Sequence, residues 1–417
     1  MDKTIRTDRV DVLDGIRAGA ILIVAFFHFW QQSWFSVQYS SPFLTKIGIE
    51  NISTDAIHRY GFVFVDMMIM MTGFCLFLPY ARHMIEGARR PGLPDPKELW
   101  SFYKKRLVRI VPSYLFCFLI FLFFIVLPAR DHATLGDLFK DKHLMQNIIA
   151  QLTFTQNLSK STYLGTLFNG ALWTVAVEMQ FYLIFPLLAW AFRKKPLITY
   201  ACMMLTEYAF IQFVVLPKAD GDLGMWINQL PALIGVFANG MMGALLFVAL
   251  ANRLKTREKY TSILATVICF ASVFGIMQIL NAGASKYSHI QRWQVIIRFP
   301  MAMLFTIFTI AACFSAAWFR FIFSNRIARF LAAISYNFYI WHQTIAVKLK
   351  EWHIPPWTGK ELPNVSGDRK WQIMYTVIIV VASVTFATCV TYGLEKPIAK
   401  LFLRGKKKKE TEAAVKE

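Results

Sequence analysis

The sequence predicts an all-α membrane protein, with about ten transmembrane helices around a central cavity. Hydrophobic residues make up 56% of the 417 residues, charged residues make up only 17%, and phenylalanine alone occurs 38 times. The mean hydropathy is +0.44. A soluble globule cannot bury so much apolar surface, so a chain that crosses the bilayer several times is the class that fits. The same composition excludes disordered, collagen-like and disulfide-rich proteins.

The predicted helices are apolar runs long enough to cross ~30 Å of hydrocarbon, which requires about 20 residues. They cover residues 14–32, 61–80, 111–128, 171–192, 197–216, 226–250, 261–281, 295–318, 331–349 and 372–393. The first and the ninth runs also carry polar residues. Residues 1–12 are polar and no small-residue cleavage site follows the first run. We therefore expect this run to remain as a membrane helix rather than to be removed as a signal peptide.

Basic residues predict which side of the membrane each loop faces. Most Lys and Arg lie in one alternate set of segments: the N-terminal tail, 81–110, 193–196, 251–260, 319–330 and the tail from Lys396. Such loops stay in the cytoplasm, so both termini are predicted to be cytoplasmic, and the even number of spans agrees. We expect residues 1–400 to form a single membrane domain and residues 401–417 a basic, disordered cytoplasmic tail.

The net charge of +20 does not predict nucleic-acid binding. The bases stand in short clusters between apolar runs, where they flank membrane helices, and the lipid bilayer of the cell membrane is the expected partner. The six cysteines all fall inside apolar stretches and form no C-x-x-C pair. We therefore predict no metal site and no disulfide.

Two connections are predicted to have structure of their own. Asp95 and Pro96 fit the N-cap and the first turn of a helix, which would be amphipathic and lie at the membrane interface. Residues 129–170 form a long polar loop on the opposite side, with an amphipathic stretch near residues 138–154. Long loops of this kind are often functional.

The first span carries the best candidate pair for a site. Ionisable groups inside a span cost at least ~2.5–3.5 kcal/mol each, so they are functional hypotheses by default. Arg17 and His28 are about three helical turns apart, so they project from one face with ~16 Å between them along the axis. Arg17, near the cytosol, suits an anionic donor, and His28, in the outer half, suits removal of a proton from a hydroxyl. Alternatively, Arg17 snorkels and pairs with Asp14 while His28 fills a polar gap.

The fourth span carries an acid, Glu178, in an otherwise apolar helix. A buried carboxylate needs a partner, and His28 is the candidate that it would orient and make more basic. Tyr182 lies at i+4 from Glu178 and shares its face. Trp173, Gln180 or Tyr182 could donate a hydrogen bond to a tetrahedral oxyanion. A purely structural helix–helix hydrogen bond is the alternative.

Other spans carry further polar groups. Asp66 lies in the second span, ahead of Gly73, which permits close helix approach; it could support the cavity or be structural. In the ninth span, Tyr339, Trp341 and His342 form either a binding wall or an aromatic belt at the interface. Two more intramembrane charges, Glu207 and Arg298, have no predicted partner.

A basic cluster precedes the third span. Its Arg106 and Arg109 are at i, i+3 and share a helix face, so together they could clamp phosphate groups bidentately. A simple flank of basic residues in contact with lipid is the alternative interpretation.

Several segments together resemble the acyltransferase-3 family of integral-membrane acyltransferases. They are Leu13–Arg17 running to His28; Gly61 through Phe64–Asp66 to Thr72–Phe74; Phe102–Pro112; Trp173–Tyr182; Ile334–Tyr336 through Tyr339–His342; and Tyr392–Pro397. The segments follow one another in the family's order, and together they cover nearly the whole chain.

The resemblance implies transfer of an acyl group, usually acetyl or succinyl, from cytosolic acyl-CoA to a hydroxyl of a glycan or a small acceptor. Acyl-CoA is then a substrate, no cofactor is permanently bound, and the bacterial cytoplasmic membrane is the implied location. The resemblance also implies His28 as the catalytic residue, Glu178 as an essential acid, and contacts of Arg17, Arg106 and Arg109 with the CoA phosphates.

Two positions depart from the family pattern. Thr72 stands where the family often has serine, which preserves a hydroxyl. Met179 stands where the family often has a second glutamate, so Glu178 must carry any acid role alone. Because the chain ends soon after the last predicted span, we expect no fused esterase-like domain. The membrane unit would complete the reaction itself or with a separate extracytoplasmic transferase.

A transporter or flippase for a glycan or a lipid-linked sugar is the alternative function. It would also have many spans, a polar lumen and buried charges, although it does not account for cytosolic arginines together with a His–Glu pair. No inverted repeat typical of transporters is visible in the sequence. The acceptor and the acyl chain stay open, as does the choice between direct transfer and an acyl-His28 intermediate.

Overall fold

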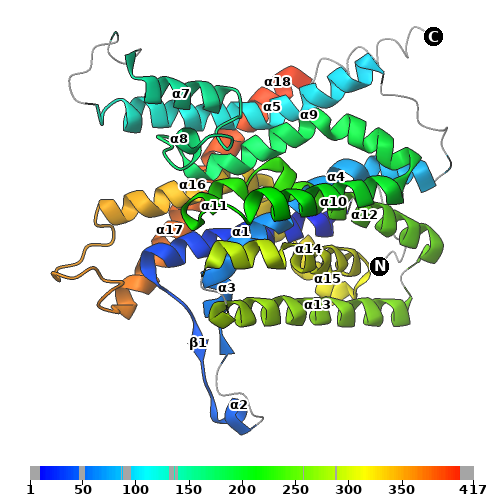
Figure 1. Cartoon of the computed structure of the whole chain (residues 1–417). Coiled ribbons are helices and arrows are strands. Elements are labelled where there is room, and N and C mark those ends of the chain that lie inside the picture. Colours follow the sequence, from blue (N-terminus) through cyan, green and yellow to red (C-terminus); the bar gives the residue numbers. More distant parts are fainter. Residues whose placement is uncertain are drawn as a thin grey trace.

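The computed structural model describes residues 10–46, 52–85, 87, 95–130, 136, 140–256, 258–286 and 289–403. Most of these residues are helical and very few are in strands (Figure 1), which confirms the predicted all-α class. Within the described ranges the only strands are β1 (Gln38–Tyr39) and β2 (Ile52–Ser53), an antiparallel pair.

Nine helical segments of the described chain are long and apolar enough to cross a membrane. They are α1 (Asp11–Ser33); α3 (Asp55–Tyr60) with η1 (Gly61–Val63) and α4 (Phe64–Ile85); α5 (Pro96–Phe121) with η2 (Leu122–Val126); η3 (Gly170–Leu172) with α9 (Trp173–Lys194); α10 (Pro196–Phe210) with η4 (Ile211–Val215); α12 (Leu230–Leu254); α13 (Lys259–Lys286); α14 (Ile290–Phe314); and α17 (Arg369–Val390) with η5 (Thr391–Glu395) and α18 (Lys396–Leu403). Each coincides with a predicted run, so the chain is a multi-pass membrane protein.

The predicted run 331–349 is part of a further long helix, α16 (Arg326–Glu351). It packs against α1 and α17 inside the bundle. This helix is less hydrophobic than the others, because it has basic residues near both ends and polar residues in its middle. Its length and its packing, more than its composition, show that it belongs to the bundle. The orientation of the two termini relative to the membrane stays a prediction.

The long helices run side by side (Figure 1), with α13 against α14 at one edge and α5 against α18 at the opposite edge. Shorter helices connect them: α2 (Pro42–Lys46), α7 (Lys142–Leu152), α8 (Lys160–Tyr163), α11 (Asp220–Trp226) and α15 (Ala317–Ser324). The hairpin that carries β1, α2 and β2 extends away from the bundle (Figure 1).

The predicted interfacial helix and the predicted third span form one element, α5. The Asp95 side chain caps this helix by accepting a hydrogen bond from the Lys97 N–H at 3.3 Å, and Pro96 occupies the first turn, as predicted. The helix then continues through Pro112. Proline removes one backbone donor but does not stop a helix whose pattern continues in phase on both sides, which is why no break separates the two segments.

The long polar loop contains the predicted amphipathic helix. Helix α7 lies within the stretch 138–154, and Asp141 caps it by accepting a hydrogen bond from the Leu144 N–H at 3.0 Å. Residues 131–135 and 137–139 of this loop lie outside the described residues.

Glycine allows α4 and α12 to pack at backbone contact. A Cβ added at Gly73 would overlap the carbonyl oxygen of Phe237, and a Cβ added at Gly240 would overlap that of Met70. The close approach predicted for Gly73 is therefore confirmed, since small residues at such crossings bring membrane helices together. This packing fixes the position of α4, which contributes to the site described below.

The predicted tail of residues 401–417 is only partly described. Helix α18 continues through Leu403, across the predicted boundary, and residues 404–417 lie outside the described part, as do residues 1–9.

Candidate functional site

Five helices enclose a cavity of about 90 Å³ that contains most of the charged residues predicted for the site. We call it the arginine cavity. Its polar lining is Arg17 from α1, Thr72 and Cys75 from α4, Arg106 and Arg109 from α5, Thr174, Glu178 and Tyr182 from α9, and Ser335, Tyr336 and Tyr339 from α16. Residues from distant parts of the sequence thus converge as the family resemblance implies.

Hydrogen bonds fix the Glu178 carboxylate at the wall of the arginine cavity. The Thr72 hydroxyl donates to Oε1 at 2.8 Å, and the Tyr182 hydroxyl donates to Oε2 at 3.4 Å. The hydroxyl preserved by threonine in place of serine is therefore used. Because both carboxylate oxygens have donors, this acid has a defined position and orientation.

The three arginines give the cavity an excess of positive charge. Arg17 approaches Asp14 at 3.5 Å, the pairing that the sequence offered as an alternative. The Arg106 guanidinium lies over the rings of Phe102 and Tyr182, 5.6 and 5.9 Å from their centroids. The Nε atoms of Arg17 and Arg106 are buried and have no hydrogen-bond partner in the described part of the chain. Three cations facing one lining carboxylate form a site suited to a polyanionic ligand.

A second cavity of about 390 Å³ lies beside the first and contains His28. We call it the histidine cavity. Its lining residues are Val24, Phe27 and His28 from α1, Phe62 from η1, Val65 and Asp66 from α4, Tyr163 and Leu164, Gly170 and Ala171 from η3, Trp173 from α9, Asn228, Gln294 from α14, and Tyr339 and Gln343 from α16.

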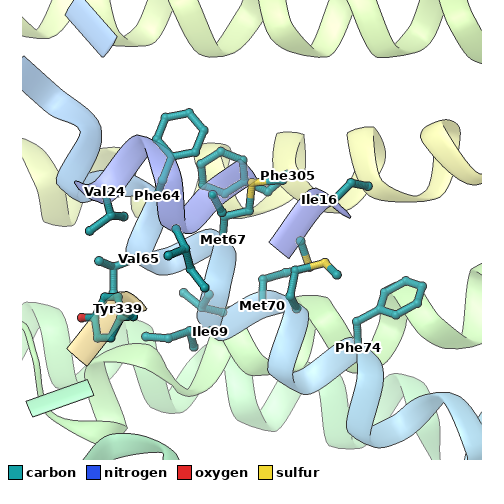
Figure 2. Close-up of a cluster of buried hydrophobic side chains, with 14 of the residues drawn as sticks. Ile16, Val24, Phe64, Val65, Met67, Ile69, Met70, Phe74, Phe305 and Tyr339 are labelled. Carbon is teal, nitrogen blue, oxygen red and sulfur yellow. The ribbon is translucent and has the colours of Figure 1, made fainter. Parts of the chain in front are cut away.

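The two cavities share Val65 and Tyr339 in their walls. Figure 2 shows the Tyr339 ring beside Val65, with Val24 and Ile69 on opposite sides of Val65. Val24 lines the histidine cavity and Ile69 lines the arginine cavity. Val65 and Tyr339 therefore form part of the partition between the two cavities.

Helix α1 presents one face to both cavities, as predicted. Arg17 and Ile21 line the arginine cavity, and Val24 and His28 line the histidine cavity. These positions recur at helical spacing, so the face that carries Arg17 continues past the partition to His28.

The predicted contact between His28 and Glu178 is absent from the structure. His28 Nδ1 is hydrogen-bonded to Gln31 Oε1 at 2.8 Å, whereas Glu178 is bound by Thr72 and Tyr182. No hydrogen bond joins the two side chains, both of which the structure describes. The two side chains lie at different positions along the bundle axis. Glu178 lies with Arg17 in the arginine cavity, and His28 lies about three helical turns further along α1.

Among the other predicted residues, Asp66, Trp173 and Tyr339 line the histidine cavity, but Gln180 does not line either cavity. The Gln180 amide donates to the Phe154 carbonyl at 2.9 Å and to Asn157 Oδ1 at 2.8 Å. It therefore ties the long loop to α9, and its amide is already used.

Trp341 and His342 are also absent from both cavity walls, and both are buried rather than placed in an interfacial belt. The Trp341 ring packs against Phe116 and Phe386. His342 Nδ1 bonds the Tyr339 carbonyl at 2.7 Å, and its ring lies 5.2 Å from that of His28, centroid to centroid. Both side chains pack behind the site.

Four polar lining residues of the histidine cavity were not predicted: Tyr163, Asn228, Gln294 and Gln343. The Asn228 amide donates to the Tyr163 hydroxyl at 2.6 Å. Burial raises the pKa of Tyr163 to about 12, against a smaller opposite effect of the Asn228 hydrogen bond, so its hydroxyl is neutral at physiological pH. The only sequence signal for this wall was the length of the loop that carries Tyr163.

The two intramembrane charges without a predicted partner now have one. Arg298 pairs with Asp66, Nε to Oδ2 at 3.1 Å. Glu207 accepts hydrogen bonds from the backbone N–H groups of Gly235 and Val236, at 2.8 and 3.3 Å. Among the described residues, no group of His, Cys, Asp and Glu could hold a metal ion.

Comparison with known proteins gives one family. The acyltransferase-domain model of this family matches residues 10–392, a range that includes every residue lining the two cavities. No curated protein and no solved structure matches the chain significantly. The match covers nearly the whole chain, and it makes the protein an enzyme that transfers acyl groups other than aminoacyl groups. The chain belongs to the acyltransferase-3 family.

Proposed function

We propose that the enzyme is an O-acyltransferase. It moves an acyl group, acetyl or succinyl, from cytosolic acyl-CoA to a hydroxyl of a glycan or related acceptor at the outer side of the bacterial cytoplasmic membrane. The supporting observation is the pair of adjoining cavities, one with three arginines and the other with His28, which share Val65 and Tyr339 in their walls.

The arginine cavity is the proposed donor site. Phosphate groups favour bidentate contacts with guanidinium groups, and Arg17, Arg106 and Arg109 supply three of them. In this proposal the phosphates contact the three arginines, of which Arg109 is exposed, and the acyl thioester end reaches toward the histidine cavity.

The histidine cavity is the proposed acceptor site. In the proposed reaction, His28 removes the proton from the acceptor hydroxyl as general base, and the oxygen attacks the thioester carbon. The carbon–sulfur bond breaks, CoA leaves as a thiolate, and the imidazolium returns the proton to it. The Tyr339 hydroxyl and the Trp173 N–H are the candidate donors to the oxyanion, since Gln180 and Tyr182 already donate elsewhere.

Glu178 has a different role in this proposal from the one that its sequence position suggested. It lies among the arginines, where its charge offsets part of their mutual repulsion and holds the Thr72 and Tyr182 hydroxyls in place. Its removal should weaken use of the donor rather than change the basicity of His28.

Purified protein in lipid nanodiscs tests the proposal, with radiolabelled acetyl-CoA and measurement of released CoA thiol. The wild type should bind acetyl-CoA and acylate a sugar acceptor. His28→Ala should bind the donor normally and transfer nothing, whereas Arg106→Gln should bind the donor weakly. Full transfer by folded His28→Ala would refute the assignment. A flippase would release no CoA thiol with any acceptor.

A further inference from the structure

A buried ion pair lies beside the acceptor site and has no place in the mechanism above. Arg298 of α14 donates from Nε to Asp66 Oδ2 of α4 at 3.1 Å, and their side chains are only 1% and 2% exposed. Asp66 nevertheless lines the histidine cavity together with His28. A carboxylate thus reaches the cavity from an otherwise buried position.

The protein holds the Arg298 guanidinium from two further directions. Its Nη1 donates to the carbonyl of Ile227 at 2.9 Å and to that of Ala232 at 3.0 Å. These carbonyls belong to the segment between α11 and α12 and to the start of α12. Because Nε and Nη1 are both fixed, Arg298 cannot turn away from Asp66, and the carboxylate oxygen that it binds is fixed as well.

The ion pair leaves one carboxylate oxygen of Asp66 able to accept a hydrogen bond from a ligand in the histidine cavity. Arg298 binds Oδ2, and within the described part of the chain Oδ1 of Asp66 receives no hydrogen bond. Arg298 Nη2 is also buried without a partner among the described residues. Burying two charges is costly unless their hydrogen-bonding capacity is used, so an unfilled carboxylate oxygen at a cavity wall points to a ligand that fills it.

The ligand must be a hydrogen-bond donor, since an ionised carboxylate only accepts. The other residues that line the cavity favour the same kind of ligand. Trp173 contributes an aromatic ring, and Gln294 and Gln343 contribute amides, which can both donate and accept hydrogen bonds. Among the described residues no cation lines this cavity, so an anionic group on the ligand would be buried there without a counter-ion.

We propose that Asp66 binds a second hydroxyl of the acceptor, next to the hydroxyl that His28 deprotonates, and that Arg298 is the positioning residue that aims the Asp66 carboxylate. This inference rests on the proposed function and adds the acceptor class to it. The acceptor is an uncharged sugar or polyol with neighbouring hydroxyls. Glu178 cannot serve in place of Asp66, because its oxygens are bound in the other cavity.

The first experiment uses wild-type protein in nanodiscs with acetyl-CoA and a panel of methyl glycosides. The panel contains neutral hexosides, their monodeoxy analogues and the matching uronosides. A hydrogen bond to a charged group is worth about tenfold to a hundredfold in affinity. We expect neutral hexosides to be acylated, the deoxy analogue lacking the second hydroxyl to raise KM by roughly this factor, and uronosides to be poor acceptors. Equal use of the deoxy analogue, or a preference for uronosides, would overturn the inference.

The second experiment uses variants. Asp66→Asn should raise KM for the neutral hexoside while leaving KM for acetyl-CoA unchanged, and it should no longer distinguish the deoxy analogue. Arg298→Lys should retain more of this discrimination than Arg298→Gln. Because Asp66→Asn leaves Arg298 buried and unpaired, the double variant Asp66→Asn/Arg298→Gln removes both charges and serves if the single variant does not fold.

The outcomes separate this inference from the proposed function. If the wild type acylates no glycoside and releases no CoA thiol, the proposed function fails and the acceptor assignment fails with it. If His28→Ala abolishes transfer but folded Asp66→Asn or the double variant keeps the wild-type KM and discrimination, only the role of Asp66 is refuted.

Discussion

Removal of one hydroxyl tests the placement of Glu178 in the donor site. Thr72→Val keeps the shape of the side chain and removes the donor that lies 2.8 Å from Glu178 Oε1. The remaining donor, Tyr182, lies 3.4 Å from Oε2, which is a weak hydrogen bond. The carboxylate then keeps its charge but loses its stronger positioning contact.

The expected magnitude follows from the strength of this contact. A hydrogen bond to a charged group contributes about 1.5–3 kcal/mol. The cavity admits water, which can replace part of the lost bond, so we expect the lower end of this range. At ~1.4 kcal/mol for each factor of ten, kcat/KM for acetyl-CoA should fall about tenfold.

Two controls make the measurement specific. Thr72→Ser retains the hydroxyl and should keep kcat/KM within about twofold, a difference below 0.5 kcal/mol. Thr306→Val removes a buried threonine hydroxyl that donates to the Ala302 carbonyl of its own helix, outside both cavities. The assay is the initial rate of CoA thiol release as acetyl-CoA is varied. If Thr72→Val behaves like the wild type, Glu178 does not act through this contact and our account of the donor site is wrong.

Three further changes test other parts of the structure. Val65→Phe enlarges the partition between the cavities, so acetyl-CoA binding should persist in a filter assay while transfer falls at least tenfold. Gln180→Leu removes both hydrogen bonds that tie the long loop to α9, so limited proteolysis of that loop should accelerate while acetyl-CoA affinity stays unchanged. Gly240→Ala forces a Cβ onto the Met70 carbonyl and should destabilise the protein by about 1–3 kcal/mol, seen as a lower Tm in detergent, whereas Gly19→Ala, with open space around its Cβ, should not.

The part of the site that the sequence predicts correctly depends on local helix geometry. The spacing of Arg17 and His28 puts both on one face of α1, however this helix is placed in the bundle. In the structure this face lines the two cavities. Asp95 is predicted as a helix N-cap in the same local way, because a cap bonds the backbone of its own first turn. Asp141, which was not predicted as a cap, makes the same kind of contact in the structure. Apolar runs identify spans for a similar reason, since the requirement to cross the bilayer applies to each helix separately.

The partner of each buried charge could not be predicted in this way. The sequence offers Asp66, Glu178 and Glu207 as acids inside spans, with His28 and Arg298 as possible partners for any of them. Only the depth of each residue in the bundle decides between these pairings, and depth depends on how helices far apart in the sequence are staggered. The amide-rich wall of the histidine cavity was hidden for the same reason, because each of its residues is ordinary on its own helix or loop.

The stagger of the helices places one carboxylate in each cavity. Glu178 lies with the three arginines and Asp66 lies with His28, so each cavity contains one carboxylate of its own. In the arginine cavity the acid is outnumbered by cations, which favours a polyanionic donor. In the histidine cavity the Asp66 charge is already balanced by Arg298, so a neutral acceptor meets no net charge. A second carboxylate in the arginine cavity would reduce its excess of positive charge. A Thr72→Asp variant, which adds a second acid beside Glu178, should therefore lose acetyl-CoA affinity while leaving the acceptor KM unchanged, and an equal change in both constants would show that the two cavities do not divide donor from acceptor.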